Sequence, residues 1–172
     1  MEQHLHLLIE YKDGKPLREP VHVESLGDGR FKILYTPGFV EGIAAGDEIK
    51  LTGEDGAFEI IRRGGNIAVK LFARESVMPF RNELHESAVQ LGGSLDGAIE
   101  RGMSFTFPLS TGFATIEKFF NTWVETHEGW TWYYGNIYDL KDGHTPLGWW
   151  NAAEPKSGFA GLWARITGKH SK

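Results

Sequence analysis

The sequence has 172 residues, of which 41% are hydrophobic and 24% are charged, as in a soluble globular protein that buries a core. It contains no cysteine, which excludes disulfides, thiolate nucleophiles and cysteine-based zinc sites. The formal net charge of −5 argues against nucleic acid as the main partner.

The N-terminal residues MEQHLHLLIEYKDG contain neither the basic region nor the long apolar run of a signal peptide. No window of the chain approaches the roughly 20 apolar residues that span a membrane. We therefore expect a cytoplasmic protein without a membrane partner.

The first part of the chain predicts short strands separated by tight turns. Hydrophobic residues alternate on both sides of Asp28-Gly29, and the pattern recurs around Asp55-Gly56; such dipeptides are typical of hairpin turns. Strands at this spacing form a small, strongly bent antiparallel sheet or a barrel-like unit. They are expected at 5–11, in two hairpins at 21–37 and 47–63, and at 66–74.

Helical periodicity begins in the segment SVMPFRNELHESAVQLGG. Ser76 can cap this first helix, and Gly92-Gly93 stops it. Its apolar face consists of Phe80, Leu84, Ala88 and Leu91.

A second helix is predicted at 111–127, with Ser110 or Thr111 as its cap and Gly129 after its end. Its apolar stripe consists of Phe113, Ile116, Phe120, Trp123, Val124 and His127. We expect this stripe to be buried against a mainly antiparallel sheet.

From residue 66 to residue 140 the predicted order is strand, helix, two strands, helix, strand. This is the ferredoxin-like split βαβ order, in which two helices cover one face of an antiparallel sheet. We therefore expect an α+β protein that forms one compact unit. Its parts are a β-rich, barrel-like part at 1–65, a ferredoxin-like part at 66–140 and an aromatic tail at 141–172, with a short helix near GFAGLWARI.

The segment HVESLGDGRFKILYTPGFVEGIAAGDEIKL (22–51) contains a strand, a DGRF turn, a TPGF passage and a GIAAGDEI turn into the next strand. In these motifs the chain resembles the bacterial domain-of-unknown-function family 4265. The likeness covers residues 21–138, is most specific at 42–49 and excludes the tail after Leu140. It implies a barrel-like opening followed by an α/β half, and it transfers no activity and no catalytic residues. Some relatives resemble small accessory or toxin-neutralising proteins, which implies a binding role.

Acidic residues gather between residues 41 and 59, where Lys50 is the only base. This distribution predicts either attraction of a basic partner or a solvated turn region. Asp47 in AAGDEI could act as a base or a metal ligand, but its position after Gly46 favours a structural carboxylate that accepts backbone N–H bonds. The acids expected to contact a partner are Glu41, Asp47, Glu48, Glu54 and Asp55.

His4 and His6 are two residues apart on a predicted strand, so their imidazoles share a face. His22 and Glu24 repeat this spacing on another strand. If the two strands pair, these side chains could converge on zinc or iron. Otherwise they are ordinary strand residues, and the protein is expected to bind no metal and no cofactor.

Other polar residues do not form a recognisable catalytic motif. A histidine base on either helix would need a second acid beside a pocket. The serines lack the context of a nucleophile elbow. These residues are His85, Glu86, His127, Ser94, Ser104 and Ser110.

Aromatic residues concentrate in GWTWYYGNIYDLKDGHTPLGWW. Trp130 and Trp132 share one face of a predicted strand, and we expect them to pack on Trp123 and Phe120 of the second helix. Trp149 and Trp150 follow the regular elements. At least one of them contacts a partner, or the tail folds back and places both over the sheet as a lid.

Together these features predict a small cytoplasmic binding protein without enzymatic activity. Its most concrete form is an immunity protein that occludes a cognate bacterial toxin, with Trp149, Trp150 and the acids meeting a basic toxin domain. The alternative is a small-ligand or metal-binding protein or enzyme with a pocket between the two halves, in which His4, His6 or His22 serve as ligands. A structural or regulatory module of a larger assembly is the third class.

Overall fold

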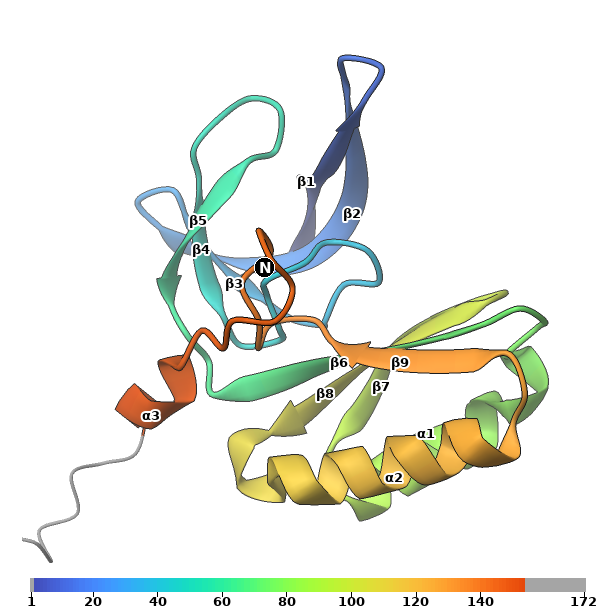
Figure 1. The fold of residues 1–172 in the computed structure, drawn as a ribbon. Helices are drawn as coiled ribbons and strands as arrows, with labels where there is room; N and C mark the ends of the chain where they lie inside the picture. The colour runs from blue at the N-terminus through green and yellow to red at the C-terminus, as the bar shows by residue number, and fades with distance from the viewer. Residues whose placement is uncertain (1, 154–172) are drawn as a thin grey trace, which may run out of the picture.

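The computed structural model describes residues 2–153, which form two antiparallel sheets and a layer of helices (Figure 1). The chain is therefore an α+β protein. The first sheet contains β1 (Glu2–Lys12), β2 (Lys15–Gly27), β3 (Arg30–Ile33), β4 (Glu48–Leu51) and β5 (Phe58–Arg62), in that order. The second part contains β6 (Asn66–Ala73), α1 (Arg81–Gln90), β7 (Ser94–Ile99), β8 (Gly102–Pro108), α2 (Phe113–Thr126) and β9 (Trp130–Tyr134).

Tight hairpins build the first sheet. Asp28 (φ 54°) and Gly29 (φ 72°) both adopt the left-handed conformation that a two-residue hairpin turn requires, which explains the Asp-Gly dipeptide there. β2 pairs with β3 across this turn, and β4 pairs with β5 across the turn that contains Asp55-Gly56. Both predicted hairpins are confirmed.

The first sheet is open, so of the two expected forms it is an antiparallel sheet and not a closed barrel. Within residues 2–153, β1 and β5 are opposite edges of the sheet and do not pair. The sheet curls enough for Leu8 N of β1 to donate a hydrogen bond to Gly56 O in the β4–β5 turn at 2.9 Å. A Cβ at residue 56 would lie 2.2 Å from His6 O, so the approach of the two edges depends on this glycine.

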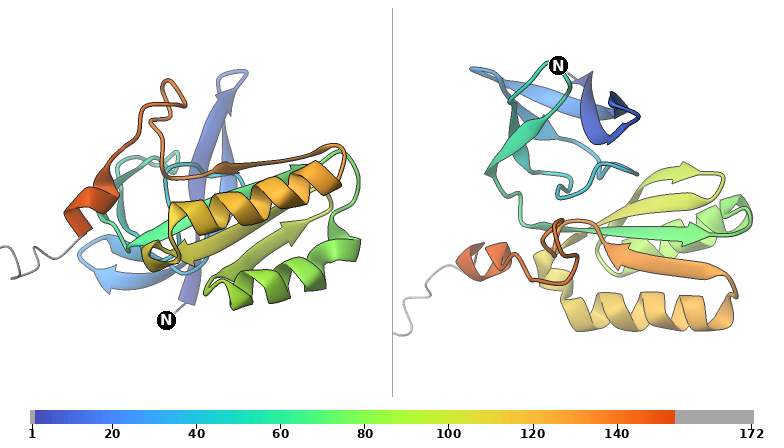
Figure 2. Two further views of the ribbon diagram at one scale, coloured as in Figure 1. Left: turned by 60° about the horizontal axis from the view of Figure 1, so that its bottom comes forward. Right: turned by 45° about the horizontal axis from the view of Figure 1, so that its top comes forward.

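The second sheet has the strand order β7-β8-β6-β9, with every neighbouring pair antiparallel. Helices α1 and α2 cover one of its faces, and the first sheet lies beyond the other face (Figures 1 and 2). β8 and β6 are therefore central strands, while β7 and β9 are edges.

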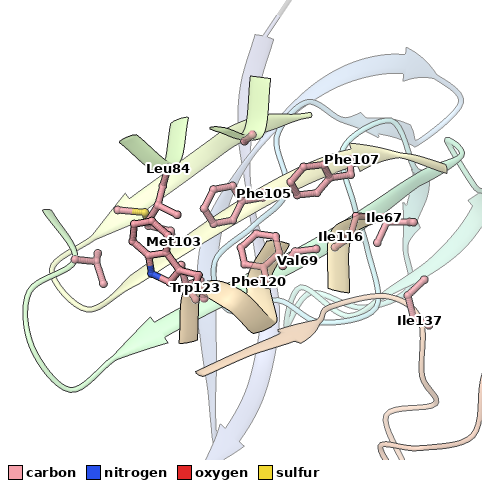
Figure 3. Close-up of a cluster of buried hydrophobic side chains, with 13 residues drawn as sticks. Ile67, Val69, Leu84, Met103, Phe105, Phe107, Ile116, Phe120, Trp123 and Ile137 are labelled. Carbon is pink, nitrogen blue, oxygen red and sulfur yellow. The ribbon is translucent and has the colours of Figure 1, made fainter. Parts of the chain in front are cut away.

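A hydrophobic core fills the space between the second sheet and its helices (Figure 3). Side chains at alternate positions of β6 and β8 point to this side, because successive side chains of a strand face opposite ways. From α2, Ile116, Phe120 and Trp123 are buried, as the helical stripe predicts. Phe113 is partly buried against the same core. A second, smaller core of Leu7, Val21, Val23, Ile33, Val40, Ile43 and Ile49 belongs to the first sheet.

The start of α2 differs from the prediction. The capping residue is Gly112, not Ser110 or Thr111, and it provides no side-chain hydrogen bond. Residues 109–111 form a short 3-10 turn (Leu109–Thr111), in which Thr111 Oγ1 donates to Leu91 O at 3.0 Å. Thr111 thus ties the start of α2 to the end of α1.

After β9 the chain forms a small hairpin-like turn, in which Leu147 N donates to Ile137 O at 2.8 Å. The last described element is α3 (Trp149–Ala153). The helix expected near GFAGLWARI falls at 158–166 and lies outside the described residues. None of the described helices is long and apolar enough to cross a bilayer.

Candidate functional site

A cleft of about 310 Å³ lies between β2 and the face of the second sheet that the helices leave open. The loop after β3 forms one wall of this cleft. Its Tyr35 and Phe39 side chains are 47% and 43% exposed, and the Phe39 ring centroid lies 6.4 Å from that of Phe72. The cleft therefore presents aromatic rings together with the polar side chains of Glu19, His22, Asp96 and Ser104.

Two carboxylates hold the wall of the cleft by accepting backbone N–H groups of the loop. Asp96 Oδ2 accepts one from Thr36 N at 2.7 Å. Glu19 accepts three, from Gly38, Phe39 and Val40. Bonds between N–H groups and carboxylates are stronger than neutral ones, so the loop is preorganised. Both carboxylates are thus engaged within the fold.

Lys70 of β6 is fully buried between the sheets. Its Nζ donates to Val40 O at 2.8 Å and lies 3.0 Å from Glu41 Oε1. Tyr133 Oη of β9 donates to the same Glu41 oxygen at 2.9 Å. Burial lowers the pKa of Lys70, and the nearby Glu41 carboxylate opposes that shift. A Cβ at residue 135 would lie 2.9 Å from Lys70 Cε, so Gly135 makes room for the lysine.

A second hollow, of about 560 Å³, runs along β9 and is termed here the β9 groove. Residues of α2, Glu41 and several residues after β9 line it together with β9. None of the described residues that line it is a lysine or an arginine. They are Glu41, Glu117, Asn121, Trp132, Tyr133, Tyr134, Tyr138, Asp139, Leu140 and Gly143. The groove therefore combines aromatic rings with carboxylates.

The polar atoms of three groove aromatics, Trp132, Tyr133 and Tyr134, bond to polar side chains that also line the groove. Trp132 Nε1 donates to Asn121 Oδ1 at 2.9 Å, and Tyr134 Oη donates to Glu117 Oε1 at 3.3 Å. Burial, and then the neighbouring carboxylates, raise the pKa of Tyr133 and of Tyr134. Both phenols consequently remain neutral donors in ordinary buffers, and the rings are held in fixed positions.

Alternation along β9 assigns its rings to two faces. Trp130 and Trp132 point to the helices, where their ring centroids lie 5.7 Å from Trp123 and 5.4 Å from Phe120, respectively. This packing confirms the expectation for the two tryptophans. Tyr133 points to the opposite face and reaches Glu41.

Asp47, expected among the surface acids, is fully buried. Its carboxylate accepts hydrogen bonds from Ala44 N at 3.0 Å, Gly64 N at 2.7 Å and Arg63 Nη1 at 3.1 Å. Burial raises the pKa of Asp47, while these partners oppose the shift. The structural alternative for this residue is confirmed, and Asp47 presents no charge to a partner.

The other predicted acids occupy three different places. The Glu48 side chain is 11% exposed and accepts a bond from Arg62 Nε at 2.9 Å, so its charge is already paired. Glu54 and Asp55 lie in the β4–β5 turn, where Asp55 accepts a hydrogen bond from Tyr11 of β1. Among these acids, Glu41 alone lines the β9 groove.

Trp149 and Trp150 lie in α3 and are both partly buried against the core of the second sheet. Trp149 Nε1 donates to Asn136 O at 2.8 Å, and the Arg63 guanidinium lies 5.5 Å from its ring centroid. The Trp150 ring centroid lies 5.4 Å from that of Phe113. Both rings therefore pack against residues of the protein's own fold.

The strands that carry the N-terminal histidines do pair, with His4 opposite His22 and His6 opposite Pro20. His4 Nε2 and His22 Nε2 share a hydrogen bond at 3.0 Å, and His22 Nδ1 lies 2.6 Å from Glu2 Oε1. Within residues 2–153, no group of three or more His, Asp or Glu side chains is arranged to hold a metal ion.

Several groove residues were missed from the sequence, namely Glu117, Asn121, Tyr138 and Asp139. A signal existed in α2, because Glu117 and Asn121 are four residues apart and therefore share one helix face. That face is polar beside a hydrophobic stripe, but its proximity to the last strand follows only from the sheet order.

Residues 19–132 match the model of a family described as a domain of unknown function (DUF4265). The chain belongs to this family. A hypothetical protein from Neisseria gonorrhoeae has a similar solved structure, with a TM-score of 0.62 and 18% sequence identity over 78% of this chain and 94% of that chain. At this identity the likeness concerns the fold. No curated protein matches the sequence.

Proposed function

We propose that this family member is a small, non-enzymatic binding protein that docks a basic segment of a protein partner in the β9 groove. Its most concrete form is a cytoplasmic immunity protein that occludes a cognate bacterial toxin. One observation carries the proposal: a concave surface lined by aromatic rings and carboxylates, without a lysine or an arginine among its described residues.

Both kinds of groove residue suit a basic segment. Carboxylates attract lysine and arginine side chains and raise the rate of encounter. The faces of Trp and Tyr rings accept cationic groups and also pack against the methylene stems of these side chains. Because hydrogen bonds already hold Trp132 and Tyr134, binding orders few side chains and loses little conformational entropy.

The charge of the groove comes mainly from Glu117 and Asp139. Glu41 is paired with the buried ammonium of Lys70, so its charge is largely balanced within the fold. Glu117 is exposed and contacts the Tyr134 hydroxyl, a neutral donor. Among residues 2–153, the Asp139 carboxylate accepts a hydrogen bond only from the backbone N–H of Lys141.

Capture of the partner from a native-host lysate, followed by titration calorimetry of the identified protein, tests the proposal. Glu117→Lys should weaken binding by roughly tenfold through a slower association rate, and added salt should shrink the difference. The matched control is Glu54→Lys, an equal charge reversal in the exposed β4–β5 turn. Equal losses for the two variants, or none for Glu117→Lys, would contradict docking in the groove.

The cleft between the sheets favours a second candidate, a small-ligand binder. Its volume of about 310 Å³ and the exposed rings of Tyr35 and Phe39 are typical of a ligand pocket. Screening of small aromatic and cationic compounds by thermal shift tests it. A compound that stabilises the original protein but not the Tyr35→Ala variant would favour this candidate, whereas equal stabilisation of both would reject the cleft as its site.

We also propose that residues 66–140 are a ferredoxin-like half, distinct from the β-rich part at 1–65 and the tail at 141–172. The alternation of strands and helices from β6 to β9 and the sheet order β7-β8-β6-β9 support this assignment. Excision and separate expression of 66–140 tests it. A cooperatively folded fragment would support an autonomous half, and an unfolded one would show that the first sheet is required.

A further inference from the structure

Among the described residues, β9 is an edge strand whose second side is unpaired. Within residues 2–153 its only neighbour is β6, which it pairs with antiparallel. Gly135 N donates to Ala68 O at 2.8 Å and Arg74 N donates to Gly129 O at 3.1 Å. Since hydrogen-bonded positions alternate in antiparallel pairs, residues 131 and 133 also bond to β6. The backbone N–H and C=O groups of Trp132 and Tyr134 therefore point away from the sheet, along the β9 groove.

This free side is an uninterrupted template for another strand. The register between β6 and β9 runs without a shift from Val69 opposite Tyr134 to Ala73 opposite Trp130. The other edge strand of the sheet, β7, has a register shift between Leu95 and Gly97. Irregularities of that kind hinder the addition of a strand. The two edges thus differ, and the regular edge lies in the groove.

We infer that the partner segment binds as an added β-strand, through main-chain hydrogen bonds to Trp132 and Tyr134, with its basic side chains on the face that meets Glu117. This inference rests on the proposed function and specifies how the groove is occupied. A segment in this position directs alternate side chains to the two sides of the sheet. One set meets Glu117 and Asn121 of α2, and the next set meets Glu41 and Tyr133.

The charges at the edge select a basic partner over a second copy of this chain. If β9 paired with β9 of another molecule, two edges flanked by Glu117 would meet, and like charges at a strand pair are destabilising. An extended segment with lysine or arginine at alternate positions brings opposite charges together instead. The occupant is therefore an extended basic segment of a different protein.

Amide hydrogen exchange followed by NMR tests the strand addition with a defined probe, a short blocked peptide of alternating arginine and valine. In the free protein, the amides of Trp132 and Tyr134 should exchange fast, while those of Thr131 and Tyr133 should be protected. The peptide should slow exchange at Trp132 and Tyr134 and leave Thr131 and Tyr133 unchanged, which makes these two the internal control.

Two further peptides separate strand addition from charge attraction. Alternating arginine and proline keeps the charge but cannot pair as a strand, and alternating glutamate and valine keeps the strand tendency but reverses the charge. Both should bind roughly tenfold more weakly or not at all. Equal binding of the arginine–proline peptide, no binding of the arginine–valine peptide, or self-association of the protein through β9 would each overturn the inference.

The native partner distinguishes this inference from the function on which it rests. Suppose that Glu117→Lys weakens the binding of a captured partner, but that the partner leaves amide exchange at Trp132 and Tyr134 unchanged. The groove then binds the partner by side chains alone, and strand addition is rejected. If the captured partner is insensitive to Glu117→Lys, the proposed function itself fails, whatever the peptides do.

Discussion

Removal of the charge of Glu41, with its shape retained, should destabilise the protein because it isolates a buried ammonium. Lys70 is fully buried, and its Nζ contacts only Glu41 Oε1 at 3.0 Å and Val40 O at 2.8 Å among the described residues. In Glu41→Gln the amide oxygen can still accept from Tyr133 Oη, so the change is confined to the charge. Lys70 then either keeps its positive charge, with only the Val40 carbonyl and the new amide beside its Nζ, or loses its proton.

The expected cost follows from the burial of the two partners. Loss of one member of a fully buried ion pair costs about 3–5 kcal/mol. The Glu41 side chain is 31% exposed, so water compensates part of the loss, and we expect a decrease of roughly 2 kcal/mol in the free energy of unfolding. Lys70→Met is the matched variant. It removes the buried ion and leaves Glu41 in contact with water, so its cost should stay below about 1 kcal/mol, and the double variant should resemble it.

Urea unfolding, monitored by tryptophan fluorescence at neutral and alkaline pH, measures these differences. The pKa of Lys70 lies below its ordinary value of 10.5, so the charged lysine costs stability below its folded-state pKa. That cost diminishes as the pH rises from the folded-state pKa toward 10.5. The penalty in Glu41→Gln should therefore shrink at alkaline pH. Equal costs for Glu41→Gln and Lys70→Met, or a penalty that grows with pH, would refute this reasoning.

Three other predictions concern the core, a turn and the groove phenols. Phe120→Ala should lower the free energy of unfolding by about 3–5 kcal/mol, since Phe120 is fully buried; a cost below about 1 kcal/mol in urea unfolding would show that the core can close over the gap. Gly56→Ala should cost roughly 2 kcal/mol or more, because φ is +88° and the added Cβ would meet His6 O; an unchanged unfolding midpoint would contradict the contact between the two edges of the first sheet. Tyr133 and Tyr134 should ionise above the ordinary tyrosine pKa of 10.0 in an ultraviolet titration. The stability that their neutral forms contribute should be present below pH 10.0 and lost as the pH rises through their raised pKa values. Ionisation of all phenols together near pH 10.0 would contradict this prediction.

Local signals in the sequence were sufficient for most elements of the fold. The turn at Asp28-Gly29 needs two left-handed residues, and this pair of residue types satisfies that need without tertiary contacts. The stripe of α2 likewise identifies Ile116, Phe120 and Trp123 as core residues, because an amphipathic helix buries its apolar face. The sequence left a bent sheet and a barrel as alternatives for the first part, since whether two edges pair depends on the curl of the whole sheet.

The site was less predictable, because charge counts do not reveal burial. Asp47 lies in an acidic stretch, yet its partners Arg63 and Gly64 come from a segment 16 and 17 residues away. The tryptophans at 149 and 150 follow the elements predicted from periodicity, and a short helix there, which the sequence did not predict, lets both pack on the core. The β9 groove depends on β9 being an edge strand, and strand order is not encoded in local periodicity.

Hydroxyl-radical footprinting of the protein alone and in complex with its captured partner tests docking in the β9 groove most directly. Trp132, Tyr133 and Tyr138 line the groove, Tyr35 lies in the cleft between the sheets, and Tyr11 lies on β1. We predict that the partner protects the groove aromatics and leaves the oxidation of Tyr35 and Tyr11 unchanged. Protection of Tyr35 or Tyr11, with oxidation of the groove aromatics unaltered, would contradict the proposed site.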